Sequence, residues 1–391
     1  MFPVVLFLFV FLVAVSSLPT ETYRHDSLDS LKLVHVFVRH GARYPQRSEI
    51  YPHDPHKFLH EDLGQLNKLG KVNSHKVGKF LRKRYGSFLG DAYQYGVVRA
   101  TSTSLPRTKM TALLVLAGLF PPTASERWSD EIPNWQPVPY NYLDGRDDTW
   151  LQRPTMYCPR YKKEVEKAQN SPEVEKLLKQ HANTLDYIKN KTGKNIGDLE
   201  TVFRLYQLFS SEDSLNLELP GWATQVFPYF VLNLTLQRYI LENSNNLLKR
   251  LSGGRMLSKV TKHWNEKIND EIYPTNTKLL LFSIHEHNLV NLMFALGIFN
   301  YEFPNYSSAI ILELHQFRAN EEYSVRILHL VDVNKPPEVR KLKDCHEMCP
   351  MNIFLRSIDN LLPRNYTQEC ESERSLDRPE WRPPPHGKQR G

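Results

Sequence analysis

Residues 37–45, FVRHGARYP, bring two arginines and a histidine together directly after an apolar run. Arg39 and Arg43 lie on either side of His40, and two guanidinium groups this close repel each other unless an anion lies between them. Arginine forks match the oxygens of a phosphate two at a time. A neutral histidine among them can attack phosphorus and form a covalent intermediate. The spacing therefore predicts a site for a tetrahedral anion, most simply a phosphate, with His40 as the nucleophile.

Two distant segments place polar residues at equivalent points. Arg107 follows the apolar run 95–100, and His285 and Glu286 follow the run 277–284. Ligands of open α/β sheets bind at the carboxyl ends of the strands, where helix N-termini add free N–H groups and positive partial charge. In such a site a protonated Glu286 can donate its proton to the leaving oxygen. The predicted phosphate ligands are Arg39, Arg43, Arg107 and His285.

The apolar pattern predicts an α/β fold with a mostly parallel sheet flanked by helices, because strand-like runs alternate with helical ones. Helices are expected at 105–119 and 285–297. The expected strands are 31–38, 95–100, 277–284, 308–314 and 323–330.

Composition divides the chain into a core, a cap and two terminal segments. Residues 135–260 are polar with a helical pattern, which predicts a helical cap inserted into the α/β core. The Pro- and Arg-rich end, 371–391, is expected to be a disordered tail. The predicted core therefore comprises residues 18–134 and 261–370.

The N-terminus predicts secretion. Its apolar stretch from Phe2 to Val15 is too short to span a bilayer comfortably, and small residues follow it. We interpret residues 1–17 as a signal peptide, with an uncleaved anchor as the alternative. No other apolar segment is long enough to span a membrane, so the mature protein is expected to be free of the membrane. The net charge of +7 is spread along the chain without a block of like charges, which argues against a nucleic-acid partner.

Cysteines and glycosylation signals agree with secretion. The four cysteines suggest two disulfides, and the sequence alone allows three pairings. The short spacing of Cys345 and Cys349 favours a local loop, which leaves Cys158 to pair with Cys370. Sequons for N-glycosylation occur at Asn190, Asn233, Asn305 and Asn365.

We expect neither a metal nor another cofactor. The spacing of His285 and His287 occurs in metal sites, but no third ligand is evident nearby. Position 289 is leucine, so the HExxH zinc motif is absent. His287 is instead interpreted as a pocket residue or a neighbour of the helix N-terminus.

Four motifs together resemble the histidine acid phosphatases, a branch of the histidine phosphatase superfamily. RHGARYP at 39–45 is similar to the RHGxRxP signature of that family, and PRTKMTALLVLAGLFPP at 106–122 is similar to its second arginine segment. LPGWAT at 219–224 and CHEMCP at 345–350 also resemble it. The resemblance covers roughly residues 30–370 and is strongest to secreted insect acid phosphatases, including venom types.

The resemblance implies a phosphohistidine intermediate on His40 and hydrolysis of small phosphate monoesters in acid, without a metal. It assigns phosphate binding to the three arginines and to His285. The proton donor of the family follows this histidine and is commonly aspartate, whereas this chain has Glu286. The extra methylene moves the proton by roughly a bond length.

Other functions remain open at this point. A phytase or inositol polyphosphate phosphatase would use the same core with a more basic pocket, and a secreted phosphoester-binding protein with reduced activity would follow if Glu286 fails as a donor. A phosphomutase is disfavoured by the signal peptide. A homodimer is also open, as is the lysosomal lumen as an alternative location.

Overall fold

The computed structural model of the chain describes residues 28–317 and 322–371. The predicted signal peptide and, apart from Glu371, the predicted disordered tail lie outside these residues.

One sheet forms the centre of the molecule, with strand order β3-β2-β4-β1-β5-β6-β7 and β8 beside β6. The parallel strands are β1 (Leu31–Arg39), β2 (Val98–Ser102), β3 (Asn141–Tyr142) and β4 (Leu279–Ile284). The antiparallel strands are β5 (Ala309–Gln316), β6 (Tyr323–Leu330), β7 (Glu338–Arg340) and β8 (Cys349–Pro350).

The predicted α/β class is confirmed, but the sheet is mixed rather than mostly parallel. Residues 317–322 connect β5 to β6, and so short a connection permits only an antiparallel pair. The parallel half contains the strand ends that carry the predicted site.

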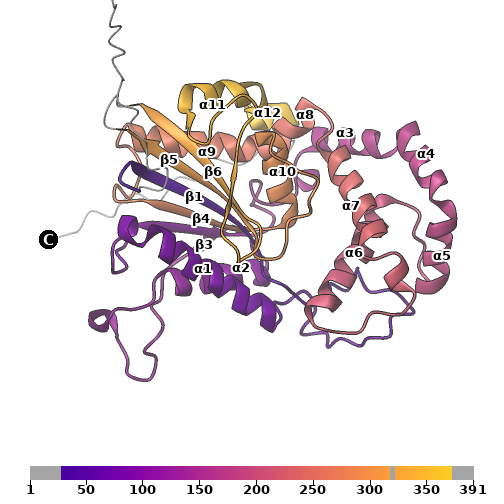
Figure 1. Cartoon of the computed structure of the whole chain (residues 1–391). Helices are drawn as coiled ribbons and strands as arrows, with labels where there is room; N and C mark the ends of the chain where they lie inside the picture. Colours follow the sequence, from indigo (N-terminus) through magenta and orange to yellow (C-terminus); the bar gives the residue numbers. More distant parts are fainter. Residues whose placement is uncertain (1–27, 318–321, 372–391) are drawn as a thin grey trace, which may run out of the picture.

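Helices cover both faces of the sheet and make three layers (Figure 1). Helices α1 (Lys68–Leu89) and α2 (Pro106–Leu119) pack on the face that carries Val36. Phe37 points to the opposite face, where β1 is therefore also buried. That face is covered by α9 (Arg255–Ile268), α10 (Glu286–Leu296) and α11 (Met351–Ile358).

Two glycines let the RHGAR segment lie directly on α1. A Cβ at Gly41 would collide with the carbonyl oxygen of Gly70, and a Cβ at Gly70 would collide with that of Ala42. Only glycine permits so close an approach of two backbones. The loop after β1 is thereby fixed against the helix.

A second group of helices lies beside the sheet at the right of Figure 1. It has its own apolar core, built around Leu205, Phe209 and Leu234 and joined by Tyr51 from the loop after β1. The predicted cap interval, 135–260, contains these helices and also the start of α9, which packs on the sheet. The helices are α3 (Pro159–Gln169), α4 (Pro172–Gln180), α5 (Ala182–Thr192), α6 (Leu199–Ser214), α7 (Tyr229–Glu242) and α8 (Asn246–Lys249).

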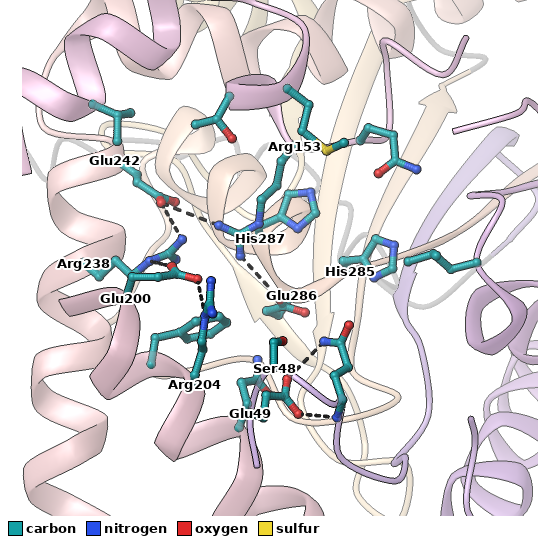
Figure 2. Close-up of a pocket in the computed structure, with 18 of the residues that line it drawn as sticks. Ser48, Glu49, Arg153, Glu200, Arg204, Arg238, Glu242, His285, Glu286 and His287 are labelled. Atoms are coloured by element: carbon teal, nitrogen blue, oxygen red, sulfur yellow. Dashed lines mark hydrogen bonds and ion pairs between the residues drawn. The ribbon is translucent and has the colours of Figure 1, made fainter. Parts of the chain in front are cut away.

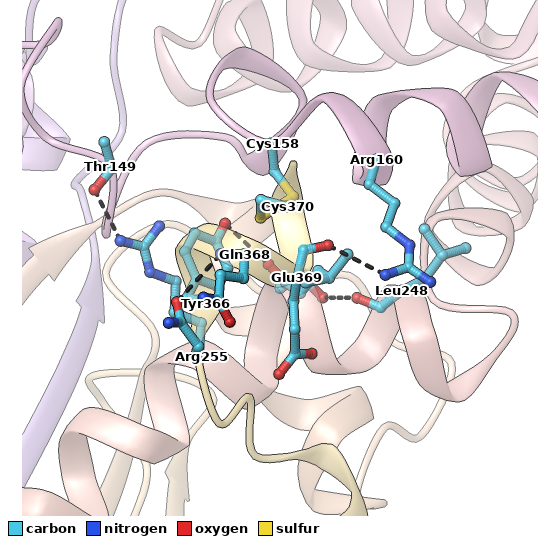
Figure 3. The surroundings of a disulfide bond; sticks show 12 residues. Thr149, Cys158, Arg160, Leu248, Arg255, Tyr366, Gln368, Glu369 and Cys370 are labelled. Carbon is cyan, nitrogen blue, oxygen red and sulfur yellow. Dashed lines mark hydrogen bonds between the residues drawn. A yellow bond between two sulfur atoms is a disulfide. The ribbon is translucent and has the colours of Figure 1, made fainter. Parts of the chain in front are cut away.

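Both disulfides favoured by the sequence are present. Cys345 pairs with Cys349, and Cys158 pairs with Cys370 over a separation of 212 residues. The second bond ties the start of α3 to the last described helix, α12 (Tyr366–Cys370), as Figure 3 shows. All four sequon asparagines are exposed.

Within the part of the chain that the structure describes, no helix combines the length and apolar character needed to cross a membrane.

Candidate active site

The parallel pairing of β1 with β4 brings the predicted residues to one edge of the sheet. Arg39 lies opposite Ile284, so the residues that follow each strand are neighbours. The backbone N–H of His40 donates to the carbonyl oxygen of Ile284 at 2.9 Å. The ring centroids of His40 and His285 are 5.4 Å apart.

A cavity of about 470 Å³ opens at this edge, between the sheet and the helices beside it (Figure 2). Arg39 is buried at 2% exposure beside Glu286 and is not one of the residues that line the cavity. The predicted site residues that line the cavity are His40, Arg43, Arg107, His285 and Glu286.

The imidazole of His40 is held in one tautomer. Its Nδ1 lies 2.9 Å from the carbonyl oxygen of Gly41, which can only accept a hydrogen bond. Nδ1 therefore carries the hydrogen, and Nε2 keeps an unshared electron pair. Burial lowers the pKa of His40 well below its ordinary value, and positive charge, chiefly that of Arg107, lowers it further. His40 is thus neutral in acid, as a nucleophile must be.

Arg39 and Arg43 are both anchored by protein groups. Arg39 donates to the carbonyl oxygen of Pro304 at 2.6 Å and stacks on Tyr306, with the ring centroid 4.1 Å from its Cζ. Arg43 makes a two-bond pair with Glu49, at 2.8 and 2.6 Å. Burial alone would lower the pKa of Arg43, but Glu49 more than offsets this effect and raises it.

Arg107 lacks a negatively charged partner among the described residues. Burial and the neighbouring Arg43 lower its pKa to about 10, so it remains charged in acid. Its Nε has no hydrogen-bond partner, and no ion pair joins Arg107 to a carboxylate among the described residues. A buried cation without a partner is costly, so this position favours a bound anion.

A row of hydroxyl groups orients His285. Its Nε2 is 3.0 Å from Oγ1 of Thr103, which is 2.6 Å from Oγ1 of Thr108. The Thr108 hydroxyl donates to the carbonyl oxygen of Leu105 at 2.8 Å, so Thr103 donates to Thr108 and accepts from His285. Burial and Arg107 also lower the pKa of His285, which is therefore neutral.

Glu286 opens helix α10 and is 7% exposed. Its Oε1 accepts a hydrogen bond from the Tyr239 hydroxyl at 3.4 Å and lies 3.5 Å from a nitrogen of Arg153. Its Oε2 is 4.0 Å from Nε of Arg39. Burial raises the pKa of Glu286, but Arg39, His287 and Arg153 together outweigh burial and hold it well below the ordinary value. The carboxyl group is therefore ionised in the ligand-free protein.

Several residues of the site carry no signal in the sequence. Glu49, six positions after Arg43, could have been noticed as a counter-charge, but nothing marks it as the partner. Gln207 on α6 reaches Arg39 at 3.4 Å. Arg153 and Glu242 belong to the region predicted as a cap, where sequence pattern gives the helices but not the direction of their side chains.

A metal ion is the alternative occupant to consider. Ligand atoms of His40, His285 and Glu286 lie within 4.8 Å of one another, a spacing at which a metal could bind. His287 lines the same cavity, as one of its two predicted interpretations has it. The charge of Arg39 and Arg107 beside these groups opposes a cation and attracts an anion. The donor set therefore fits phosphate better than a metal.

A mixed sheet covered on both faces, with a histidine and arginines at the carboxyl ends of its parallel strands, defines the histidine phosphatase class of fold. The profile of the histidine phosphatase superfamily (branch 2) matches residues 30–329. This chain belongs to that superfamily, as its motifs indicate.

Its relatives include several acid phosphatases. Venom acid phosphatase Acph-1 of Apis mellifera is 34% identical over 348 residues, which cover 87% of this chain and 88% of that protein. Lysosomal acid phosphatase of Homo sapiens is 33% identical over 350 residues, 88% of this chain and 80% of that protein.

Among solved structures, the phytase of Hafnia alvei in complex with tartrate aligns with a TM-score of 0.65 at 15% identity, over 87% of this chain and 98% of that chain. A phytase of Klebsiella sp. ASR1 aligns with a TM-score of 0.64 at 17% identity, over 86% of this chain and 96% of that chain. Identities this low establish a shared fold and nothing more.

Proposed function

We propose that this protein is a secreted acid phosphatase that hydrolyses phosphate monoesters through a phosphohistidine intermediate on His40. One observation carries the proposal: a neutral His40, whose Nε2 is unprotonated, and an arginine without a carboxylate partner among the described residues, Arg107, line the same cavity. The family and the acid phosphatases among its relatives support the same reaction.

The reaction has two steps. Nε2 of His40 attacks phosphorus while the bond to the leaving oxygen breaks, and Glu286 gives that oxygen a proton. Arg39, Arg43 and Arg107 stabilise the charge on the remaining phosphate oxygens in the transition state. Water then attacks phosphorus, Glu286 accepts the proton of the water, and the phosphorus–nitrogen bond breaks to release phosphate and free His40.

Acid is needed because Glu286 must carry a proton in the first step. The arginines keep this carboxyl group ionised in the free protein. A bound phosphate dianion adds negative charge beside Glu286 and so raises the pKa of this carboxyl group. His40 stays neutral in the same pH range because its own pKa is lowered.

A phytase is the second candidate, since phytases share the fold. The charges of the cavity wall favour simple monoesters instead. Every lining cation except Arg107 already pairs with a glutamate among the described residues, so the wall offers little free positive charge for a polyphosphate. The lining glutamates are Glu49, Glu166, Glu200, Glu242 and Glu286.

Secretion is supported by the predicted signal peptide, two disulfides and four exposed sequon asparagines. A relative found in venom supports the same location, whereas lysosomal relatives support the lysosomal lumen as the alternative.

The test is turnover by the purified mature protein across p-nitrophenyl phosphate, glycerol 2-phosphate and phytate, each measured against pH. We expect both monoesters to be hydrolysed with a maximum in acid, and phytate to be a poor substrate. Binding of phosphate without turnover of any ester would support the phosphoester-binding alternative, and a preference for phytate would support the phytase.

A further inference from the structure

Arg153 reaches the proposed proton donor from outside the sheet. It lies just before the short 3₁₀ turn Pro154–Met156, and its side chain crosses the cavity to Glu286 (Figure 2). Its two terminal nitrogens face two carboxylates, Oε1 of Glu286 at 3.5 Å and Oε1 of Glu242 at 3.7 Å. About a quarter of the side chain, 26%, is exposed to the cavity.

We propose that Arg153 is a positioning residue for proton transfer, which fixes the carboxyl group of Glu286 and ties it to helix α7 of the neighbouring helical group. The inference deepens the proposed function and rests on it, because it assigns to Arg153 a part in the reaction of the same site.

The far end of Arg153 is held by a chain of ion pairs in which Glu242 and Arg238 are buried and Glu200 is partly exposed. Glu242 accepts from Arg238 at 2.9 Å, and Nε of Arg238 lies 2.9 Å from Glu200. The guanidinium groups of Arg153 and Arg238 both lie over the ring of Phe203, at 5.7 and 4.7 Å from its centroid. Arg153 therefore connects Glu286 to an ordered wall rather than to solvent.

The backbone that carries Arg153 is attached to the helix that carries Glu286. Nδ2 of Asn288, in the first turn of α10, donates to the carbonyl oxygen of Leu151 at 3.0 Å. Asp148 accepts from the backbone N–H of Leu151 at 2.8 Å, which orders this turn. On the other side, the Cys158–Cys370 bond fixes the start of α3. The distance between Arg153 and Glu286 is thereby set by both ends of the segment.

The contact with Arg153 matters more for a glutamate than it would for an aspartate at position 286. Its side chain has one more rotatable bond than aspartate, and that freedom must be restricted before the proton can be delivered to one place. Tyr239 holds Oε1 through a single hydrogen bond at 3.4 Å. Arg153 supplies the second contact to the same oxygen, and with it a positive charge.

The charge of Arg153 also affects when Glu286 holds its proton. Among the groups that face the Glu286 carboxylate, His285 and His287 have lowered pKa values and are neutral in mild acid. The hydroxyl group of Tyr239 is also neutral. In mild acid the nearest cations are therefore Arg39 and Arg153, while Arg43 and Arg107 also interact electrostatically with Glu286. Removing Arg153 takes away one of these positive charges and raises the pKa of Glu286. The facing groups are Arg39, Arg153, Tyr239, His285 and His287.

The experiment compares Arg153→Met and Arg153→Lys with wild type by measuring kcat/KM against pH for p-nitrophenyl phosphate and glycerol 2-phosphate, because kcat/KM reports the step in which Glu286 donates its proton. Arg153→Met should move the alkaline limb of the profile to higher pH by about 1–3 units, which is the pKa shift expected when a nearby opposite charge is removed. It should also lower the ratio of the glycerol 2-phosphate rate to the p-nitrophenyl phosphate rate about tenfold on the acid side, because the donor is misplaced.

Arg153→Lys separates charge from geometry. It keeps the charge, so the limb should stay near its wild-type position while the rate ratio still falls. Arg204→Met is the matched control, because Arg204 lines the same cavity but pairs with Glu200 instead of Glu286. Its alkaline limb should coincide with that of wild type.

Coincident limbs for Arg153→Met and wild type would overturn the inference, and so would an equal shift in Arg204→Met. An equal loss for both substrates at every pH would mean a structural role only. If Arg153→Met does not fold, an unchanged rate ratio in Arg153→Lys overturns the inference and a lowered one supports it. Absence of turnover in the wild-type protein would overturn the proposed function instead.

Discussion

Replacing Glu286 by glutamine tests the assignment of the proton donor. The change keeps the size of the side chain but removes both the proton and the negative charge. Proton donation is worth about 10²–10⁴-fold in rate, and the loss should depend on the leaving group. An alkyl alcohol leaves poorly without a proton, whereas p-nitrophenolate is stable as an anion.

The same replacement should also strengthen the binding of phosphate, because Glu286 lies beside two arginines that attract anions. Its carboxylate lies 4.0 Å from Arg39 and 3.5 Å from Arg153, and it competes with a phosphate dianion for their charge. At about 4 Å and an effective dielectric constant of about 20, one such pair interacts by about 4 kcal/mol before desolvation is counted. Removing the carboxylate should therefore strengthen inhibition by inorganic phosphate while the rate falls.

The assay measures kcat/KM for glycerol 2-phosphate and p-nitrophenyl phosphate together with the inhibition constant of phosphate, because kcat/KM excludes the second step, in which Glu286 acts as a base for both esters. In Glu286→Gln we expect kcat/KM for the alkyl ester to fall about 10²–10⁴-fold, a much smaller loss for the aryl ester, and a lower inhibition constant. Glu286→Asp should keep much of the activity, since it restores the residue common in the family. An equal loss for both esters in Glu286→Gln would refute the role. His287 is then a poor substitute, because its pKa is lowered to about 3 by burial and by Arg153.

Three further predictions address the nucleophile, the metal and stability. When the reaction of the wild-type protein with labelled substrate is quenched in base, acid-labile phosphate should remain on the peptide that contains His40. His40→Ala should lose both this label and its turnover while its circular dichroism spectrum stays unchanged; label on serine or aspartate would mean a different reaction class. Turnover should survive exhaustive chelation, because arginines supply the positive charge that a metal would otherwise provide; loss in EDTA that zinc or magnesium restores would contradict this. Asp54 and Glu212 are buried carboxyl groups; one oxygen of Asp54 and both oxygens of Glu212 lack a hydrogen-bond donor among the described residues, and burial raises the pKa of both. Above the ordinary carboxyl pKa the folded state therefore binds more protons than the unfolded state, so this pair stabilises the fold in acid and its contribution is lost as pH rises toward 8. The thermal unfolding midpoint should therefore fall between pH 5 and 8, and Glu212→Gln should make this fall smaller. An unchanged dependence of the midpoint on pH would rule out the pair as its source.

The positions of the strand-end residues could be predicted because each motif is local in the sequence. The proposed nucleophile, the arginines and Glu286 each follow an apolar strand, and parallel pairing of β4 with both β1 and β2 is enough to bring them together. Helix α1 was missed for a local reason as well. Gly70, Gly78 and Gly86 interrupt its pattern, although Gly70 and Gly78 are what permit its close packing on the 39–43 segment and on α2.

The rest of the site depends on contacts between segments that have no common period. Arg153, Glu242 and Gln207 come from three places in the region predicted as a cap, and each is an ordinary polar residue in its own segment. The antiparallel half of the sheet was not expected because a run of apolar residues indicates a strand but not its direction. The short connection between β5 and β6 makes these two strands antiparallel to each other, but it leaves the direction of β5 relative to β1 undecided.

The arginines of the site affect the proposed nucleophile and the proposed acid in opposite ways. Burial and the positive charges together keep His40 unprotonated, as a nucleophile must be, whereas the positive charges keep Glu286 ionised, so that it lacks the proton an acid must donate. A phosphate dianion bound at this site would offset part of the positive charge around Glu286, while Arg153 would remain 3.5 Å from the carboxylate. If Glu286 is the acid, as we propose, it would gain its proton when substrate binds, and the remaining charge of Arg153 would set the pH at which it does so. On this proposal the glutamate can serve in place of the commoner aspartate, because these charges and contacts, rather than the length of the side chain alone, decide where and when the proton is held.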